Sequence, residues 1–143
     1  MEGPNAISYN SAMAKILIVD DEPAVVMLMR FILEKAGHTV SESCNGQEAL
    51  KDLGVDPPNP GFALPDLILL DVMMPIVDGY TVAITLTNSP RAKGVPIIVV
   101  TAKNDIRQMF EALPSVKGFF SKPFDPKSLR EAVDRIIAGA PPK

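Results

Sequence analysis

Acidic side chains directly follow two aliphatic runs of this sequence. Asp20 and Asp21 come after the run KILIV at 15–19, and Asp71 comes after the run LILL at 67–70. Carboxylates that lie close together need a shared cation, because their mutual repulsion and desolvation are costly. Mg²⁺ prefers oxygen ligands and takes one or two carboxylates while it keeps several waters. If the three side chains meet, they predict a magnesium site.

Two more polar residues follow later strands of the predicted fold. Thr101 comes after the run at 95–100, and Lys122 comes after the short run at 118–121. A lysine and a hydroxyl beside a divalent cation complete the set that holds the three equatorial oxygens of a transferring phosphoryl group. Asp71 is then the carboxylate left to attack phosphorus, which yields an acyl phosphate. Taken alone, Asp71 fits a turn or helix-capping aspartate equally well.

Five predicted strands alternate with five predicted helices. Uniformly aliphatic runs indicate strands buried on both faces, and apolar residues at helical spacing indicate the helices between them. The strands are expected at 15–19, 39–44, 67–70, 95–100 and 118–121, and the helices at 24–36, 46–53, 80–87, 104–113 and 128–137. The fourth helix is expected to be short or irregular, because Pro114 truncates it.

This alternation predicts the α/β class with a doubly wound, five-stranded parallel sheet and helices on both faces. The carboxyl ends of parallel strands lie on one edge of the sheet, where the acids, Thr101 and Lys122 would gather. A piece of a larger barrel would need more strand–helix units than 143 residues supply.

Composition limits the classes of function. A net charge of −3 gives no electrostatic basis for binding nucleic acid. No apolar run approaches the roughly 20 residues that span a bilayer, so no membrane segment is expected. The single cysteine, Cys44, cannot form an internal disulfide and fits a reducing cytoplasm. His38, at the start of a predicted strand, is not placed to favour zinc.

The chain is expected to hold one domain at 15–138, with a short tail at 139–143. Residues 1–14 lack the basic cluster and apolar core of a signal peptide, and we interpret them as a disordered leader or a remnant of cloning. The segment 55–65 contains four prolines and is expected to be an ordered loop, whose role the sequence does not indicate. The six residues after Ile137 are too few for a further domain, which leaves a stand-alone protein or one domain of a longer protein as alternatives.

The order of these motifs closely resembles the receiver domain of bacterial two-component response regulators. The resemblance rests on Asp20-Asp21, on Asp71 within the run LLDVMMPIVDG at 69–79, on Thr101-Ala102 and on Lys122-Pro123-Phe124, and it covers about 15–137. It implies a flavodoxin-like sheet of order 2-1-3-4-5 and a cytoplasmic signalling protein. It also implies that the chain accepts a phosphoryl group rather than turning over external substrates.

The resemblance also implies a role for each matched residue. Asp71 would take a phosphoryl group from a histidine on a partner kinase or phosphotransfer protein. Asp20, Asp21 and Asp71 would hold Mg²⁺, with Mn²⁺ as a substitute, and the backbone carbonyl of Met73 would complete the protein ligands. Lys122 would pair with the phosphate.

Three further features follow from the same resemblance. Thr101 and Phe119 would form a switch, in which Phe119 can swing in or out but lacks the hydroxyl group of a tyrosine. The Lys122-Pro123 peptide bond would be cis. The segment 113–117 departs from the usual Gly-Ala-Asp-Asp approach to the last strand, which leaves the output partner open.

Several of these residues also have structural interpretations. We interpret Glu22 as a solvated acid in the first turn of a helix and Asp78 as a helix cap rather than a metal ligand. Phe119 could equally be a core residue. Two other functions remain as alternatives: a docking module of receiver fold that ignores phosphorylation, and, less well supported, a small phosphatase with an aspartate nucleophile.

Overall fold

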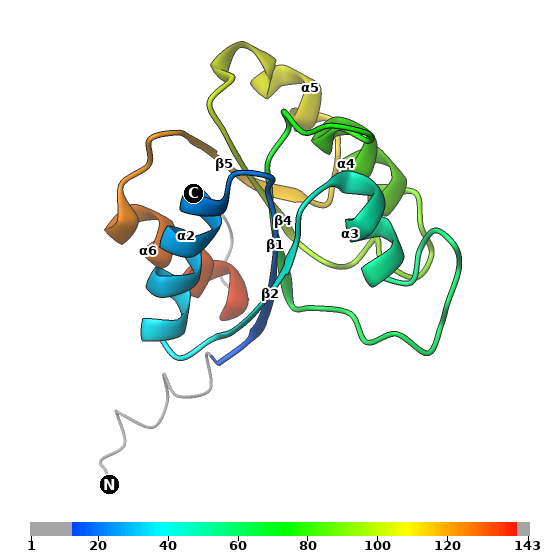
Figure 1. The fold of residues 1–143 in the computed structure, drawn as a ribbon, viewed down its shortest axis with the longest axis horizontal. Helices are drawn as coiled ribbons and strands as arrows, with labels where there is room; N and C mark the ends of the chain where they lie inside the picture. The colour runs from blue at the N-terminus through cyan, green and yellow to red at the C-terminus, as the bar shows by residue number, and fades with distance from the viewer. Residues whose placement is uncertain (1–12, 140–143) are drawn as a thin grey trace, which may run out of the picture.

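A computed structural model describes residues 13–139. Its five strands form one parallel sheet in the order β2-β1-β3-β4-β5 (Figure 1). The strands are β1 (Lys15–Val19), β2 (Thr39–Ser43), β3 (Leu67–Leu70), β4 (Ile97–Thr101) and β5 (Val116–Ser121). The predicted fold class, parallel sheet and strand order are therefore confirmed.

Five α-helices of the described residues cover the two faces of the sheet. They are α2 (Pro23–Lys35), α3 (Gly46–Asp52), α4 (Gly79–Thr87), α5 (Arg107–Glu111) and α6 (Pro126–Ile137). Helices α2 and α6 pack on one face, and α3, α4 and α5 on the other (Figure 1). The side chains of β3 are fully buried because alternate residues enter the two separate cores. This explains why its sequence is aliphatic without alternation.

The segment before β5 differs in detail from the sequence-based prediction. The helix expected at 104–113 is a 3₁₀ turn, η1 (Asn104–Ile106), followed by the single short helix α5. Strand β5 begins at Val116, two residues earlier than expected. Phe110 on α5 is 1% exposed. The part of the expected helix that is α-helical is therefore the part that places an aromatic ring in the core.

The loop at 55–65 lies against the body of the protein, as predicted. Val55 and Leu64 pack on the core beneath α3 and α4. Arg91 links the loop to the end of α3, because its Nε donates to Leu53 O at 3.1 Å and its Nη1 donates to Pro60 O at 3.2 Å. A charged side chain therefore joins the loop to its neighbouring helix through two backbone carbonyls.

The ends of the chain bear on two of the predictions. Residues 1–12 of the expected leader and 140–143 of the expected tail lie outside the described residues. Ala14, by contrast, is buried, and its carbonyl accepts the N–H of Thr39 at the start of β2. Within 13–139, no helix has the length and apolar character needed to cross a membrane.

Candidate functional site

The three aspartates that the sequence singles out meet at the carboxyl ends of the strands. Strands β1 and β3 are neighbours, with Val19 opposite Leu70, so Asp20 and Asp71 leave the sheet side by side. One carboxylate oxygen from each of Asp20, Asp21 and Asp71 lies within 4.8 Å of the others. Asp20 and Asp71 are only 2% and 3% exposed, whereas Asp21 faces solvent. The cluster is thus buried on one side and open on the other.

Backbone groups fix the two buried carboxylates. Asp20 Oδ1 accepts the N–H of Glu22 at 2.9 Å, and Asp71 Oδ1 accepts the N–H of Val72 at 2.8 Å. Gly79 is required nearby, because a Cβ atom there would lie 2.0 Å from the Asp71 carbonyl oxygen. The absence of a side chain at Gly79 lets the start of α4 approach the end of β3. In both aspartates the second oxygen, Oδ2, remains for other partners.

Lys122 supplies positive charge to this cluster from the end of β5. Its Nζ lies 2.9 Å from Asp20 Oδ2, 2.7 Å from Glu22 Oε1 and 3.4 Å from Asp71 Oδ2. The lysine side chain is 11% exposed. Burial opposes its charge, but the hydrogen bonds to Asp20 and Glu22 and the nearby negative charges outweigh burial, so the pKa of Lys122 is raised.

Burial also dominates the electrostatics of Asp20. Desolvation raises the pKa of this carboxyl group, and the negative charge of Asp71 adds to the effect. The hydrogen bonds from Lys122 and from the Glu22 N–H oppose the rise without cancelling it. Asp20 and Asp71 are two neighbouring buried carboxylates that share one lysine, and a further cation beside them would reduce their repulsion.

Glu22 is exposed to solvent as interpreted, but it is the N-cap of α2 rather than a residue of its first turn, and it also contacts Lys122. Its side chain is 58% exposed, yet it makes the shortest of the three contacts with Lys122. The sequence could not reveal this contact, because the two residues are 100 positions apart. Lys122 is the only basic side chain that the described residues pair with these acids.

The donor set fits a hard divalent cation. All of the candidate ligand atoms in the cluster are carboxylate oxygens, with no imidazole or thiolate among them. Oxygen-only sites of this kind suit Mg²⁺ and similar ions, whereas zinc prefers nitrogen and sulfur ligands. Four acidic residues with one lysine leave an excess of negative charge, and a divalent cation would offset it.

Thr101 lies at the same edge of the sheet, at the end of β4. Its backbone carbonyl accepts the N–H of Lys122 at 2.8 Å, which ties the ends of β4 and β5 together. The Thr101 side chain is buried, and its Oγ1 accepts the N–H of Lys103 at 3.3 Å. The Lys122–Pro123 peptide bond is cis.

Asp78, Met73 and Phe119 are the other residues that the sequence analysis singled out. Asp78 is the N-cap of α4, since its Oδ1 accepts the N–H of Thr81 at 2.8 Å, and its interpretation as a cap is confirmed. Met73, in the loop after Asp71, has a side chain that is 60% exposed. Phe119, on β5, is half-buried against Phe110, with ring centroids 6.3 Å apart.

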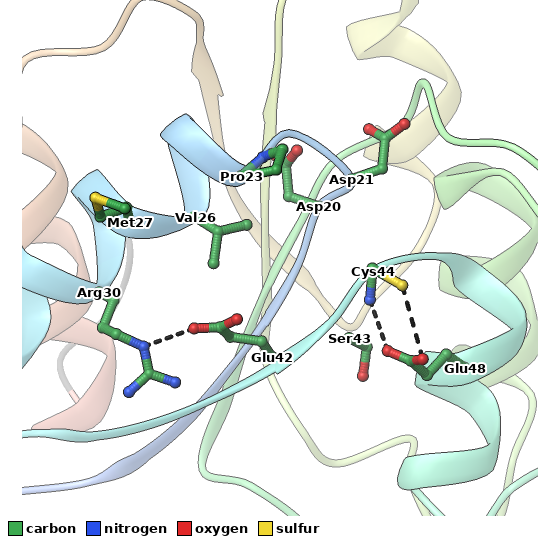
Figure 2. A pocket seen from close by; sticks show the side chains of 10 residues that line it. All are labelled: Asp20, Asp21, Pro23, Val26, Met27, Arg30, Glu42, Ser43, Cys44 and Glu48. Atoms are coloured by element: carbon green, nitrogen blue, oxygen red, sulfur yellow. Dashed lines mark hydrogen bonds and ion pairs between the residues drawn. The ribbon is translucent and has the colours of Figure 1, made fainter.

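A hollow of about 430 Å³ opens beside the cluster, between α2 and the end of β2 (Figure 2). Asp20 and Asp21 line its upper part, and the side chains of Val26 and Met27 form an apolar part of its wall. Farther down, Arg30 Nε donates to Glu42 at 2.6 Å. The hollow leaves Asp21 accessible from solvent.

Comparisons with known proteins agree with this geometry. A family model described as the response regulator receiver domain matches residues 16–134. Protein PilH of Pseudomonas aeruginosa is 30% identical over 133 residues, which cover 89% of this chain and all of that protein. Other curated relatives are longer, and the chain spans about half of their length.

Solved structures show the same fold. The response regulator TrrA from Thermotoga maritima, solved in complex with Mg²⁺ and BeF, gives a TM-score of 0.71 at 30% identity over 87% of this chain and 99% of that chain. The Mn²⁺-bound form of response regulator Rcp1 gives a TM-score of 0.70 at 27% identity over 86% and 91%. With the family model spanning most of the sequence, the chain belongs to the receiver domain family of two-component response regulators.

Proposed function

We propose that this receiver domain accepts a phosphoryl group on Asp71 from a phosphohistidine of a histidine kinase or histidine phosphotransfer protein. The observation that carries the proposal is the convergence of Asp20, Asp21 and Asp71 with Lys122 at one edge of the sheet. Asp20, Asp21 and Asp71, with the carbonyl of Met73, would hold Mg²⁺, or Mn²⁺ in its place. Relatives solved with these two ions support that choice.

The proposed step is a transfer between two nucleophiles. A carboxylate oxygen of Asp71 forms a bond to phosphorus while the phosphorus–nitrogen bond of phosphohistidine breaks, and the electron pair of that bond returns to the imidazole. The Nζ of Lys122 lies 3.4 Å from Asp71 Oδ2, and its positive charge would attract the phosphoryl oxygens. The metal ion supplies further positive charge to the same oxygens when bound.

The acyl phosphate would then act on a partner-binding face through Thr101 and Phe119. Phe119 lies on β5 and Lys122 directly follows that strand. The backbone N–H of Lys122 donates a hydrogen bond to the carbonyl of Thr101. A shift of the Thr101 hydroxyl toward the phosphate would therefore alter the packing of β4 against β5. Such a shift changes the affinity for a partner only if the partner binds the phosphorylated and unphosphorylated conformations with different affinities.

The remaining expectations follow from this function. The receiver domain is proposed to span 15–138 and to work in the cytoplasm. It would catalyse its own phosphorylation and slow dephosphorylation without turning over external substrates. A phosphatase acting on esters would need a further acid or base beside Asp71, because the carboxylates and Lys122 around it are assigned here to the metal ion and the phosphoryl group.

Incubation with acetyl phosphate and Mg²⁺, followed by intact-mass spectrometry, tests the proposal. The wild type is expected to gain the mass of one phosphoryl group, and EDTA is expected to prevent the gain. Asp71→Asn should abolish it, because the amide cannot form the acyl phosphate. Asp78→Asn is the matched control, since Asp78 is a nearby exposed aspartate that only caps a helix.

Two results would overturn the proposal. One is a wild type that gains no phosphoryl group from acetyl phosphate and shows no Mg²⁺-dependent response to beryllofluoride. The other is an Asp71→Asn variant modified as fully as the wild type. In the first case the phosphorylation-independent docking module becomes the better hypothesis, and partner affinity should then be the same for Asp71→Ala and the wild type.

A further inference from the structure

Glu22 occupies the N-cap position of α2, but its side chain does not cap the helix. An N-cap side chain usually accepts a backbone N–H of the first turn, as Asp78 does at the start of α4. The carboxylate of Glu22 instead reaches Lys122, with Oε1 2.7 Å from Nζ. The residue that begins α2 therefore uses its side chain to contact the segment after β5 rather than to stabilise its own helix.

The backbone of Glu22 is held on both sides. Its N–H donates to Asp20 Oδ1 at 2.9 Å, and its carbonyl accepts the N–H of Val26 at 3.0 Å. The following residue, Pro23, restricts Glu22 to an extended conformation, with φ −99° and ψ 106°. The side chain of Glu22 is 58% exposed, yet it extends from a fixed point beside the buried carboxylates.

Lys122 directs its hydrogen bonds away from the proposed phosphoacceptor. Among the described residues, Nζ donates to Asp20 Oδ2 at 2.9 Å and to Glu22 Oε1 at 2.7 Å. Asp71 Oδ2 lies farther away, at 3.4 Å, and forms an ion pair with Nζ without a hydrogen bond. A charge-assisted hydrogen bond is stronger than a charge contact of poor geometry. Asp71 therefore has the weakest hold on the lysine.

Glu22 differs from Asp20 in its other contacts. Asp20 is a proposed ligand of the metal ion, and its carboxylate also accepts the N–H of Glu22. Glu22 forms no ion pair with any described residue other than Lys122. Because the Lys122 side chain is only 11% exposed, this ion pair is less screened by water than one between two exposed side chains. Glu22 is thus the partner that Lys122 can lose without disturbing the proposed metal ligands.

We propose that Glu22 is a positioning residue that holds Lys122 toward the start of α2, and that Lys122 contacts a phosphoryl group on Asp71 only after it leaves Glu22. This inference rests on the proposed function. An ion pair that exists only before modification favours the unmodified state by its own free energy. Glu22 therefore lowers the affinity of the site for a phosphoryl group and sets how readily Asp71 is modified.

Two substitutions separate the reach of Glu22 from its charge. Glu22→Asp keeps the negative charge but shortens the side chain, and an aspartate at an N-cap prefers the backbone N–H groups of its own helix. Glu22→Gln keeps the length but accepts a weaker, neutral hydrogen bond from Lys122. Both variants should release Lys122. Glu131→Gln is the matched control, because Glu131 is exposed on α6 and forms no ion pair with any described residue.

The ammonium group of Lys122 reports directly on its partners. In metal-free protein with isotope-labelled lysine, the Nζ protons of the wild type should exchange slowly enough with water to give a resolved NMR signal, because Nζ is hydrogen-bonded and largely buried. The Lys122→Met variant assigns this signal by its loss. Glu22→Asp and Glu22→Gln should each shift or broaden the signal, whereas Glu131→Gln should not.

Beryllofluoride, which mimics a phosphoryl group on aspartate, measures the effect on the site. Amide spectra of the full chain, recorded during a titration at saturating Mg²⁺, give its affinity. Glu22→Asp and Glu22→Gln should each bind beryllofluoride about fivefold more tightly than the wild type, since one ion pair no longer has to break. In the bound state the Lys122 signals of the wild type and both variants should nearly coincide. Thermal unfolding checks that each variant is folded.

Three results would overturn the inference. If only Glu22→Gln binds more tightly, the charge of Glu22 repels the phosphoryl group without holding Lys122. If both variants bind more weakly, Glu22 presents Lys122 to the phosphoryl group instead of withholding it. The third result is a metal-free Lys122 signal that neither variant changes.

The same measurements separate this inference from the proposed function. A wild type that neither accepts a phosphoryl group from acetyl phosphate nor binds beryllofluoride refutes the proposed phosphotransfer. In that case the metal-free Lys122 signal still decides whether Glu22 holds the lysine. Phosphoryl uptake by a wild type whose beryllofluoride affinity neither substitution changes refutes only the role of Glu22.

Discussion

At the amino end of the sheet, His38 is buried directly before β2 with both ring nitrogens bonded. Its Nδ1 accepts the N–H of Ala14 at 3.1 Å, so Nε2 carries the proton of the neutral ring and donates it to Asp134 at 3.1 Å. The imidazole side chain is fully buried, whereas Asp134 is 44% exposed. Every polar atom of this ring has a partner, and the partners link the start of β1, the start of β2 and α6.

The carboxyl end of the same sheet is built differently. Asp20 and Asp71 are buried as deeply as His38, but they and Glu22 share a single lysine. A buried polar group that is fully paired stabilises one structure. A buried group of carboxylates with too little positive charge lowers stability and gains from a ligand that restores the balance. The polar groups of His38 at the amino end are fully paired, whereas the carboxyl end has an excess of acidic groups that the proposed metal ion would offset.

Removing Lys122 should produce the largest effect. Lys122→Met leaves two buried carboxylates without their cation, and we expect it to lower the free energy of unfolding by about 3 kcal/mol in EDTA. Mg²⁺ should recover part of that loss, because it supplies charge to the same oxygens. Urea unfolding followed by circular dichroism, with and without Mg²⁺, measures both values. Equal stability of variant and wild type in EDTA would contradict the stated role of Lys122.

Removing the histidine should have a smaller effect of a different kind. His38→Leu leaves the Ala14 N–H without its acceptor, and we expect a loss of about 2 kcal/mol in the free energy of unfolding. That loss should be the same in Mg²⁺ and in EDTA, and phosphoryl uptake from acetyl phosphate should be retained. If Mg²⁺ were to restore the stability of this variant, the two ends of the sheet would not be independent.

The smallest expected effect has the opposite sign. Asp71→Asn removes one of the two buried negative charges, while its amide oxygen can still accept the Val72 N–H. We expect the variant to gain about 1 kcal/mol of stability in EDTA, because the repulsion from Asp20 is relieved. Its response to Mg²⁺ should weaken, which Mg²⁺ titrations monitored by thermal unfolding will show. A variant less stable than wild type in EDTA would argue that Asp71 is already well compensated.

Most elements of the fold were predicted from local patterns. The bounds of β3 at 67–70 and the Asp78 cap were predicted correctly, since a buried aliphatic run and a capping carboxylate are properties of neighbouring residues. The segment at 104–113 was predicted less well. Its division into η1 and α5 places Ile106 and Phe110 in the core, and that placement depends on the sheet beneath them.

By itself, the sequence determined which segments become strands, which polar residues follow them, and hence that Asp20, Asp71, Thr101 and Lys122 gather at one edge of a parallel sheet. Only the tertiary structure decided how the charges pair. Glu22 competes for Lys122 across 100 positions, and His38 finds Asp134 across 96. Hydrophobic periodicity is a property of neighbouring residues and can be recognised in the sequence. The partner of a buried charge depends instead on which distant segments the packing of the fold brings within hydrogen-bonding distance.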